Sequence, residues 1–364
     1  MSRDILYDSL IRPLLFNSDP EEVHHFAQTA MKALAPVLPA LSLNYKKNDL
    51  SVNVFGTIFA NPIGLAAGFD KNASLIEQLP YFGFSFVEIG SVCAQPFGGN
   101  DKPRLFRLPE DEGLINRLGL NGLGAEVVAS RLERLGECKI PFGINIAKTN
   151  KAEIKGDAAV EDIAYTFERV KDIKNLKYLT INTSCPNTHE GCLKESEQLA
   201  RVLDKISPAA QKLNLPILVK LSSDSEPSFI TELVNLSSAY KVQGFVCGNT
   251  STARDGLKTN GARLQEIGNG GLSGKPLKER NLKLAKAVQG LKRENQIIIG
   301  VGGIMTGQDA FDYLSSGAEL LQIYTGFVYR GPSTVKLICE ELSAILQNKG
   351  LTLLELKSLS MQKI

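Results

Sequence analysis

A short segment near the middle of the chain combines two amides, a thiol and a rigid turn. It spans residues 182–187, with the sequence NTSCPN, directly after a run of branched apolar residues. Amide side chains donate and accept hydrogen bonds at once, which suits a neutral planar ring such as a pyrimidine. A lone cysteine is usually a small buried apolar residue, but Cys185 lies in a loop, where reactive residues concentrate. The segment predicts a ligand site with a reactive thiol.

Two lysines stand at or just past the ends of apolar runs. Lys220 lies inside the run 217–221, and Lys71 follows the run 62–67. An isolated charge is unfavourable away from water unless an opposite charge compensates it. We therefore expect both lysines to meet an anionic group of a ligand.

Glycine-rich loops follow the last two apolar runs of the chain. They are residues 300–304 (GVGGI) and 324–327 (YTGF). Glycine lets backbone N–H groups approach a phosphate, and phosphates commonly bind at the last two loops of a barrel of alternating strands and helices. The alternative is that these glycines only form tight strand ends. Because both loops carry the feature, we favour phosphate binding.

The composition argues against several other kinds of site. The 41 Lys and Arg against 39 Asp and Glu leave a net charge of +2, too small to hold a nucleic acid by neutralising its phosphates. His24, His25 and His189 form no metal-ligand cluster by their spacing, and the six Cys show no paired spacing for zinc. We expect no metal, no nucleic acid and a reducing, cytoplasmic setting.

The elements that must position these groups follow a repeated pattern. Eight short apolar runs, typical of parallel strands buried on both faces, alternate with stretches of helical period. The predicted strands are residues 62–67, 86–92, 142–147, 178–183, 217–221, 244–248, 297–301 and 320–324. The predicted helices are residues 74–81, 124–135, 161–174, 195–213, 228–240, 277–292, 308–315 and 333–348. This is the count of an α/β (β/α)8 TIM barrel; a doubly wound sheet usually has fewer units.

Residues beyond a minimal barrel gather in three places: 1–61, 93–141 and 250–276. In the first, Asp19 followed by Pro20 predicts a helix start, and residues 23–34 place apolar side chains on one face. Ahead of it lies a second amphipathic run, which we expect to break near Pro13. These helices either cap the barrel or form a hairpin that lies in a membrane surface or opens onto an apolar tunnel.

The chain resembles the dihydroorotate dehydrogenases, and most closely their quinone-dependent, membrane-associated class 2. The resemblance covers nearly the whole chain. It is carried by residues 19–21 (DPE), 64–68 (GLAAG), 100–108 (NDKPRLFRL), 113–117 (GLINR), 271–277 (GLSGKPL) and 322–324 (QIY). The helix start at Asp19 and the run 102–108 point to class 2 in particular. The resemblance implies an N-terminal helical extension, residues 1–45, and an FMN-binding barrel, residues 46–364.

The activity implied by the resemblance is the FMN-dependent oxidation of dihydroorotate to orotate in pyrimidine (UMP) biosynthesis. Ubiquinone or menaquinone would accept the electrons. The implied flavin contacts are Ala67, Gly68, Ser91, Asn145, Asn182, Lys220, Gly274, Gly303, Tyr324 and Thr325. The implied substrate contacts are Lys71, Asn116, Arg117, Leu118, Gly119, Leu120, Asn182, Asn187, Asn249 and Thr250. Quinone would enter between the two N-terminal helices and meet His24, Arg104 and Tyr324.

Cys185 is the one departure at the reaction centre. The resemblance places it at the position of the catalytic base, where class 2 enzymes carry Ser and the soluble class 1 enzymes carry Cys. A thiol has a reference pKa of about 8.5, so it is chemically the easier base near neutral pH. A soluble enzyme using fumarate or NAD, and a flavin-binding module without turnover, remain the alternatives. We expect a peripheral protein on the cytoplasmic side of the cell membrane, held through its N-terminal helices.

Overall fold

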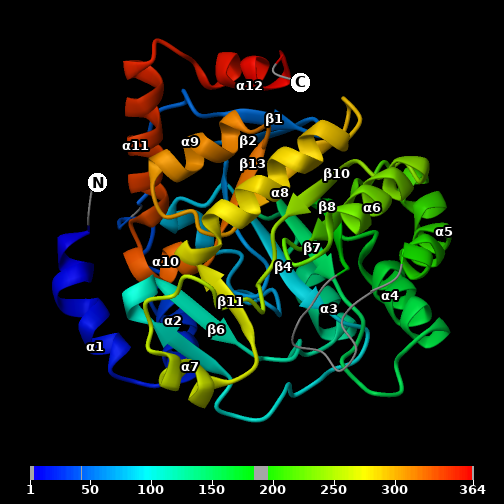
Figure 1. Cartoon of the computed structure of the whole chain (residues 1–364), viewed down its shortest axis with the longest axis horizontal. Coiled ribbons are helices and arrows are strands. Elements are labelled where there is room, and N and C mark those ends of the chain that lie inside the picture. Colours follow the sequence, from blue (N-terminus) through cyan, green and yellow to red (C-terminus); the bar gives the residue numbers. More distant parts are fainter. Residues whose placement is uncertain (1–3, 42, 184–195, 363–364) are drawn as a thin grey trace.

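The computed structural model describes residues 4–41, 43–183 and 196–362. Its centre is a closed barrel of eight parallel strands, each paired with the next along the chain and the last paired with the first (Figure 1). The barrel strands are β3 (Ile63–Leu65), β4 (Phe86–Val92), β7 (Phe142–Ile146), β8 (Leu176–Asn182), β9 (Ile217–Leu221), β10 (Gly244–Cys247), β12 (Ile297–Val301) and β13 (Leu320–Ile323). The predicted TIM barrel is confirmed.

All eight predicted strands are present, with ends within two residues of those expected. The sequence predicted the strands this closely because several of them, β7, β9, β10 and β13, are buried at every position. Continuous burial leaves a run of branched apolar residues in the sequence, which is a strong local signal.

Helices cover the outside of the barrel. Those between and after the barrel strands are α3 (Ala125–Leu135), α4 (Asp157–Val170), α5 (Ser196–Lys212), α6 (Pro227–Ala239), α7 (Gly261–Ile267), α8 (Lys278–Leu291), α9 (Gly307–Ser315), α10 (Thr325–Arg330), α11 (Thr334–Asn348) and α12 (Leu353–Gln362). Six predicted helices match to within one residue at each described end. Helix α4 begins and ends four residues earlier than predicted, and α7, α10 and α12 were not predicted.

The helix predicted at residues 74–81 is wrong. This stretch consists of turns that end in a short 3-10 helix, η2 (Leu79–Phe82). The carboxylate of Asp70 accepts hydrogen bonds from the backbone N–H of Ser74 and of Leu75, both at 2.8 Å. Pro80 also lacks the N–H that a helix interior requires. These two local features outweigh the apolar periodicity.

A second, small sheet forms over one end of the barrel and was not predicted. Strands β5 (Leu105–Leu108) and β6 (Gly113–Asn116) pair as an antiparallel hairpin, and β11 (Gly271–Gly274) adds to β6. Short 3-10 turns, η3 (Pro109–Asp111) and η4 (Lys275–Leu277), flank these strands. Two of the three surplus segments of the sequence therefore join into one sheet with its own small apolar core.

The opposite end of the barrel is closed by a hairpin of β1 (Val52–Val54) and β2 (Thr57–Phe59). The Phe59 ring packs edge-on against Phe86 of β4, with centroids 5.4 Å apart. In Figure 1 this hairpin and α12 lie at the top, whereas β6, β11 and α7 lie at the bottom.

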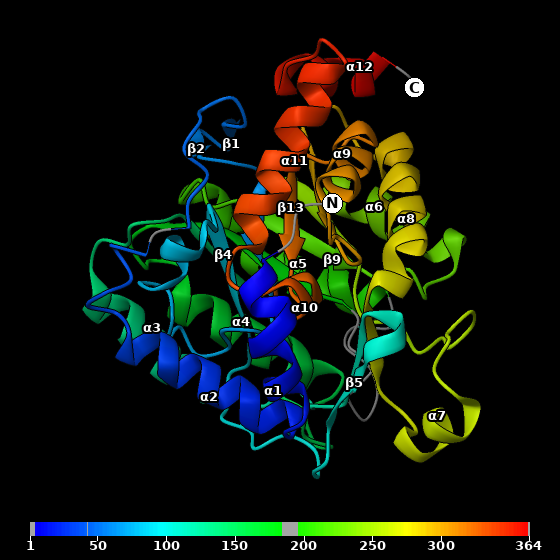
Figure 2. The same cartoon turned by 90° about the vertical axis from the view of Figure 1, so that its left-hand side faces the viewer.

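The N-terminal extension consists of two helices that lie against the outside of the molecule and meet at an angle (Figure 2). A π-helical stretch, η1 (Tyr7–Ile11), continues into α1 (Arg12–Phe16), and α2 (Pro20–Ala33) follows. The expected break near Pro13 is wrong: the chain stays helical from Tyr7 to Phe16 and changes only from π to α type between Ile11 and Arg12, just before Pro13. The predicted helix start is confirmed: Asp19 caps α2 by accepting from the N–H of Glu21 and Glu22.

Polar contacts at its edges hold the extension to the barrel. Tyr7 donates from its hydroxyl to the carbonyl of Val328 at 2.7 Å, and Arg12 donates to the carbonyl of Tyr329 at 3.0 Å. Gln28 donates to the carbonyl of Phe69 at 2.9 Å. Within the ranges that the structure describes, no helix has both the length and the apolar character of a membrane span.

Candidate active site

A cleft opens at the carboxyl ends of the barrel strands, under the small sheet. It is lined by residues 66–68, 71, 91, 105, 114, 116, 118–120, 182, 220, 248–250, 273, 274, 277, 281, 301–304 and 322–326. Every barrel strand except β7 contributes to it, directly or through its following loop. In TIM barrels the active site lies at this end.

The residues predicted to contact the flavin lie together in the cleft, with one exception. Ala67, Gly68, Ser91, Asn182, Lys220, Gly274, Gly303, Tyr324 and Thr325 line it. Asn145 of β7 does not; its fully buried side chain lies behind Ser91 and accepts from the Ser91 hydroxyl at 2.5 Å.

The predicted substrate residues divide into three groups. Lining the cleft are Lys71, Asn116, Leu118, Gly119, Leu120, Asn182, Asn249 and Thr250. Arg117 does not line it; its guanidinium donates to the carbonyls of Pro103 and Asn269 and stacks 4.8 Å from the Phe106 ring. Asn187 and the predicted base, Cys185, lie outside the described residues.

The charge of the cleft favours an anionic ligand. Among the described residues that line it, the charged side chains are Lys71 and Lys220, and none is acidic. Lys220 is only 6% exposed, and Lys71 donates to the Asn121 side chain at 2.5 Å. A buried ammonium is stabilised by an opposite charge. That both lysines face an anionic group of a ligand stays a prediction.

At the cleft, the glycine-rich loops that follow β12 and β13 let backbone segments come close together. Gly303 has φ +72°, and a Cβ there would lie 2.6 Å from the Cα of Lys278. Next to it, Thr325 begins α10 and shares a hydrogen bond of 2.9 Å with the Ser273 hydroxyl. Backbone N–H groups at such a glycine turn can face a phosphate directly. The residues present therefore fit a phosphate-bearing cofactor.

A second, apolar cavity of about 320 Å³ lies between the N-terminal helices and the barrel. Its lining is almost wholly aliphatic and aromatic, and comes from η1, α1, α2, the loop after β3, β5, β6, and the region around α10. Leu105, Leu114 and Tyr324 line both this cavity and the cleft. One layer of side chains thus separates the two spaces.

His24 and Tyr324, two of the residues predicted to meet quinone, line this apolar cavity. Burial lowers the pKa of His24 to about 4 and raises the pKa of Tyr324 to about 12, so both are neutral near pH 7. The Phe69 ring bridges them edge-on, with its centroid 4.9 Å from His24 and 5.5 Å from Tyr324.

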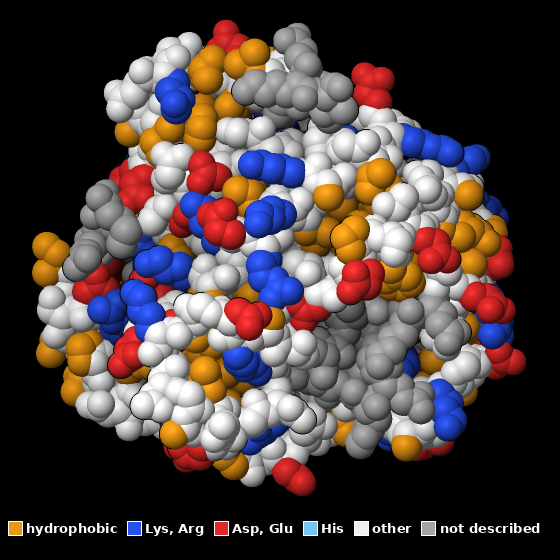
Figure 3. Space-filling model, viewed as in Figure 1, with side chains coloured by type: hydrophobic (Ala, Val, Ile, Leu, Met, Phe, Trp, Pro, Cys, Tyr) orange, Lys and Arg blue, Asp and Glu red, His pale blue; other side chains and the backbone are white. Residues whose placement is uncertain are grey.

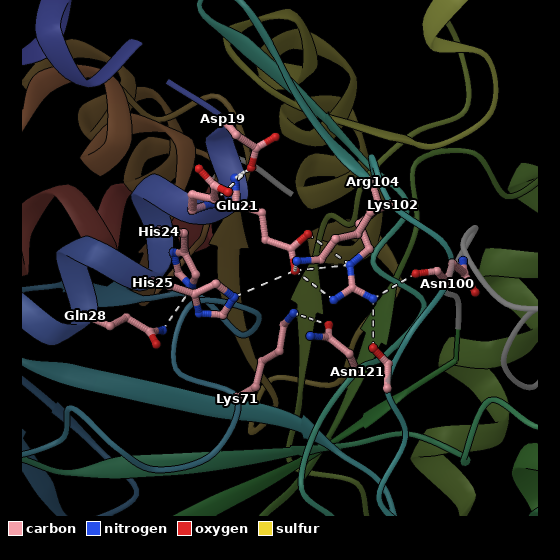
Figure 4. Close-up of polar contacts among 12 residues, drawn as sticks. Asp19, Glu21, His24, His25, Gln28, Lys71, Asn100, Lys102, Arg104 and Asn121 are labelled. Carbon is pink, nitrogen blue, oxygen red and sulfur yellow. Dashed lines mark hydrogen bonds and ion pairs between the residues drawn. The ribbon is translucent and has the colours of Figure 1, made fainter. Parts of the chain in front are cut away.

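Arg104, the third residue predicted to meet quinone, lines neither space. Its guanidinium donates to the carboxylate of Glu21 on α2 and to the carbonyls of Gly98 and Asn100 (Figure 4). Arg104 therefore connects α2 to the segment that leads into β5.

The sequence model of the dihydroorotate dehydrogenase family matches residues 49–346. The chain belongs to the dihydroorotate dehydrogenase family. The family is flavin-dependent, and the resemblance drawn from the sequence, including its class 2 character, is confirmed.

Curated relatives and solved structures agree with this membership. The chain is 40% identical to a dihydroorotate dehydrogenase (quinone) of Christiangramia forsetii, over 91% of this chain and 97% of the relative. It is 39% identical to one of Gloeobacter violaceus, over 94% and 95%. The crystal structure of DHODH from Eimeria tenella in complex with ferulenol superposes with a TM-score of 0.83 at 29% identity, covering 95% of this chain and 96% of that one.

Several residues that line the cleft or the apolar cavity were not predicted from the sequence. Arg107 lies in the apolar cavity, where it donates to the carbonyl of Ser18 at 2.7 Å and stacks 4.6 Å from the Phe16 ring. Ser273 and Asn281 line the cleft. Arg107 is the one charged residue in the otherwise apolar run 105–108, which was a usable signal. Ser273 lies within the motif 271–277 that carries the resemblance, whereas no quoted motif includes Asn281, which long-range packing brings to the cleft.

Proposed function

We propose that this protein oxidises dihydroorotate to orotate with FMN bound in the cleft, and passes the electrons to ubiquinone or menaquinone in the apolar cavity. The observation that carries the proposal is the shared wall of Leu105, Leu114 and Tyr324 between a polar, cationic cleft and an apolar cavity. A two-step redox reaction with one polar and one lipid-like partner needs two such spaces close together. Relatives named dihydroorotate dehydrogenase (quinone) support the same assignment.

The residues that would hold FMN are those at the strand ends. The turn at Gly303 and the start of α10 at Thr325 would face its phosphate, and Lys220 and Ser91 would lie toward its ring, with Asn145 behind Ser91. When bound, FMN supplies the acceptor for the hydride that leaves carbon 6 of the substrate. The buried ammonium of Lys220 would stabilise negative charge that develops beside it.

The substrate would be held by a cation and several amides. Lys71 would bind the carboxylate, and the amides of Asn116, Asn182 and Asn249 would hydrogen-bond the polar edges of the ring. Cys185, from the segment outside the described residues, would take the proton from carbon 5 as a thiolate. Such a positioned base commonly contributes about 10²–10⁴ in rate.

The outer face of the N-terminal helices supports contact with a membrane. Ile5, Leu6, Leu10 and Leu14 are between 56% and 76% exposed. In Figure 3, hydrophobic side chains gather along the left edge, where Figure 1 shows α1. We propose that residues 1–45 are a peripheral anchor on the cytoplasmic side of the cell membrane, and that residues 46–364 are the FMN-binding barrel. The anchor would deliver the quinone tail from lipid directly to the apolar cavity.

The acceptor is tested with the purified holoenzyme. Under argon, dihydroorotate should bleach the flavin absorption, and a short-chain quinone should then restore it far faster than fumarate or NAD. Failure to bleach would favour a flavin-binding module without turnover. Preference for fumarate or NAD would refute the class assignment.

A cavity-filling variant separates the two half-reactions. Ala27 of α2 lines the apolar cavity, so Ala27→Phe should slow reoxidation by quinone while leaving bleaching by dihydroorotate intact. Thr29→Phe, on the exposed side of the same helix, is the matched control and should change neither. Equal loss of both half-reactions in Ala27→Phe would show that the cavity has a structural role only.

A further inference from the structure

A carboxylate lies at the centre of the barrel, beneath the cleft. Glu88 of β4 is fully buried. Its Oε1 accepts from Asn145 Nδ2 at 2.8 Å, and its Oε2 accepts from Gln322 Nε2 at 2.7 Å and from the hydroxyls of Tyr178 and Thr180 at 3.2 Å. These four donors are neutral groups. Barrel interiors are ordinarily filled by branched apolar residues, and a buried carboxylate is unfavourable, so packing does not account for Glu88.

The carboxylate fixes the orientation of its neighbour on the side of the cleft. A carboxylate only accepts hydrogen bonds, so Asn145 must turn its nitrogen toward Glu88 and its oxygen away. That oxygen lies 2.5 Å from the Ser91 hydroxyl, which must therefore donate to it. The hydroxyl proton of Ser91 is thus directed inward, and the Ser91 oxygen is left to accept from other groups.

The hydrogen bonds across the floor of the cleft are also donated in the direction of Glu88. Asn182 Nδ2 donates to the Ser91 oxygen at 3.3 Å, and Asn249 Nδ2 donates to Asn182 Oδ1 at 3.3 Å. Each donor in this series points toward Glu88. At the far end, Asn249 Oδ1 accepts from the backbone N–H of Thr250 at 2.9 Å, so the series is fixed at one end by the buried charge and at the other by the backbone. We call the series Glu88, Asn145, Ser91, Asn182 and Asn249 the amide relay.

We propose that Glu88 is a positioning residue. Acting through Asn145 and Ser91, it determines whether the amides of the cleft present their oxygen or their nitrogen to the ligands bound there. The inference rests on the proposed function in one respect: it takes FMN and dihydroorotate as the ligands of the cleft. An amide presents a donor on one side and an acceptor on the other, so a reversed Asn182 would oppose the ligand atom it now matches. A site built for one hydrogen-bond pattern discriminates strongly against a mismatch.

The test is Glu88→Gln, which keeps the shape and removes the charge. A glutamine can offer either its oxygen or its nitrogen to Asn145, so the relay loses its fixed direction. We expect the Kd of FMN for the apoprotein, followed by flavin fluorescence, and the Kd of orotate, followed by the flavin absorption shift, each to rise about tenfold or more.

Thr180→Val is the matched control. It removes one donor from Oε2 of the same carboxylate and leaves the Oε1 contact with Asn145 in place. Its Tm should fall as that of Glu88→Gln does, whereas both ligand Kd values should stay unchanged. Equal effects of the two variants on the Kd values would show that Glu88 has only a structural role.

A double-mutant cycle with Ser91→Ala tests the route of the effect. In the Ser91→Ala background the relay is already cut, so Glu88→Gln should raise the Kd values little further. A full additional effect there would overturn the proposal. If Glu88→Gln does not fold, Asn145→Leu replaces it and cuts the relay one residue later. In the Ser91→Ala background, Asn145→Leu should then raise the Kd values little further.

The FMN measurement needs no turnover. If the wild-type protein binds FMN but dihydroorotate does not bleach the flavin, the proposed function is refuted. The effect of Glu88→Gln on the Kd of FMN still tests the relay.

Discussion

The ion pair between Glu21 and Arg104 is the main buried attachment of α2. Of the residues of α2, only Glu21 is buried, at 6% exposure, and Arg104 is 8% exposed. The Glu21 carboxylate lies 2.7 Å from Arg104 Nη2 and 3.1 Å from Nε, which is a two-pronged contact (Figure 4). Glu21→Gln keeps the shape of the side chain and removes its charge.

The expected cost is about 3 kcal/mol, because removing one partner of a buried pair costs roughly 3–5 kcal/mol and the Gln oxygen retains one hydrogen bond. Since the rest of α2 is partly or fully exposed, the loss should appear as local detachment of this helix and not as global unfolding. A change of about 3 kcal/mol corresponds to roughly a 10²-fold larger population of the detached state.

The assay is hydrogen exchange of the peptide that covers α2, followed by mass spectrometry. Exchange should be about 10²-fold faster in Glu21→Gln, the midpoint of urea unfolding should be unchanged, and reoxidation by quinone should slow while bleaching by dihydroorotate persists. Glu22→Gln, on the exposed neighbouring position, is the control. Exchange at the rate of the control, or a fall in global stability, would refute this reasoning.

The pH dependence gives an independent check on the same pair. The hydrogen bond from Arg104 lowers the pKa of Glu21 below its ordinary value. The stabilisation is therefore present above the unfolded pKa and is lost as the pH falls through the lower, folded pKa. Below the ordinary pKa of Glu21, 4.5, exchange of α2 should accelerate in the wild type, and Glu21→Gln should lack this part of the acid dependence.

Three further predictions concern the site. Because burial lowers the pKa of His24 from 6.5 to about 4, the attachment of α2 should weaken by up to roughly 3 kcal/mol as the pH drops through that window, and His24→Phe should flatten this part of the pH dependence of hydrogen exchange in α2. Gly303→Ala should weaken FMN binding at least tenfold by fluorescence titration, because its Cβ would meet Lys278, whereas Gly290→Ala, with open space around its Cβ, should not. Cys185→Ser should lower turnover by less than the full contribution of a base, about 10²–10⁴, and move the pH optimum upward; an unchanged pH profile would argue against a thiolate base.

The sequence alone determined the barrel, the start of α2 and the family. These features have local signals: continuous burial in β7 or β9, a capping residue at Asp19, and glycines at strand ends. The segment 74–81 was misassigned because the Asp70 cap and Pro80 outweigh apolar periodicity. Even this error is local, and its signals are visible in the printed sequence.

Only the tertiary structure decided how distant segments meet. It pairs β6 with β11 across more than 150 residues, places Glu21 opposite Arg104, and brings Leu105, Leu114 and Tyr324 between the cleft and the apolar cavity. Closure of the barrel also gathers the amide relay around Glu88. Sequence periodicity reports which face of an element is buried, whereas hydrogen-bond partners depend on which strand ends the closed barrel brings together.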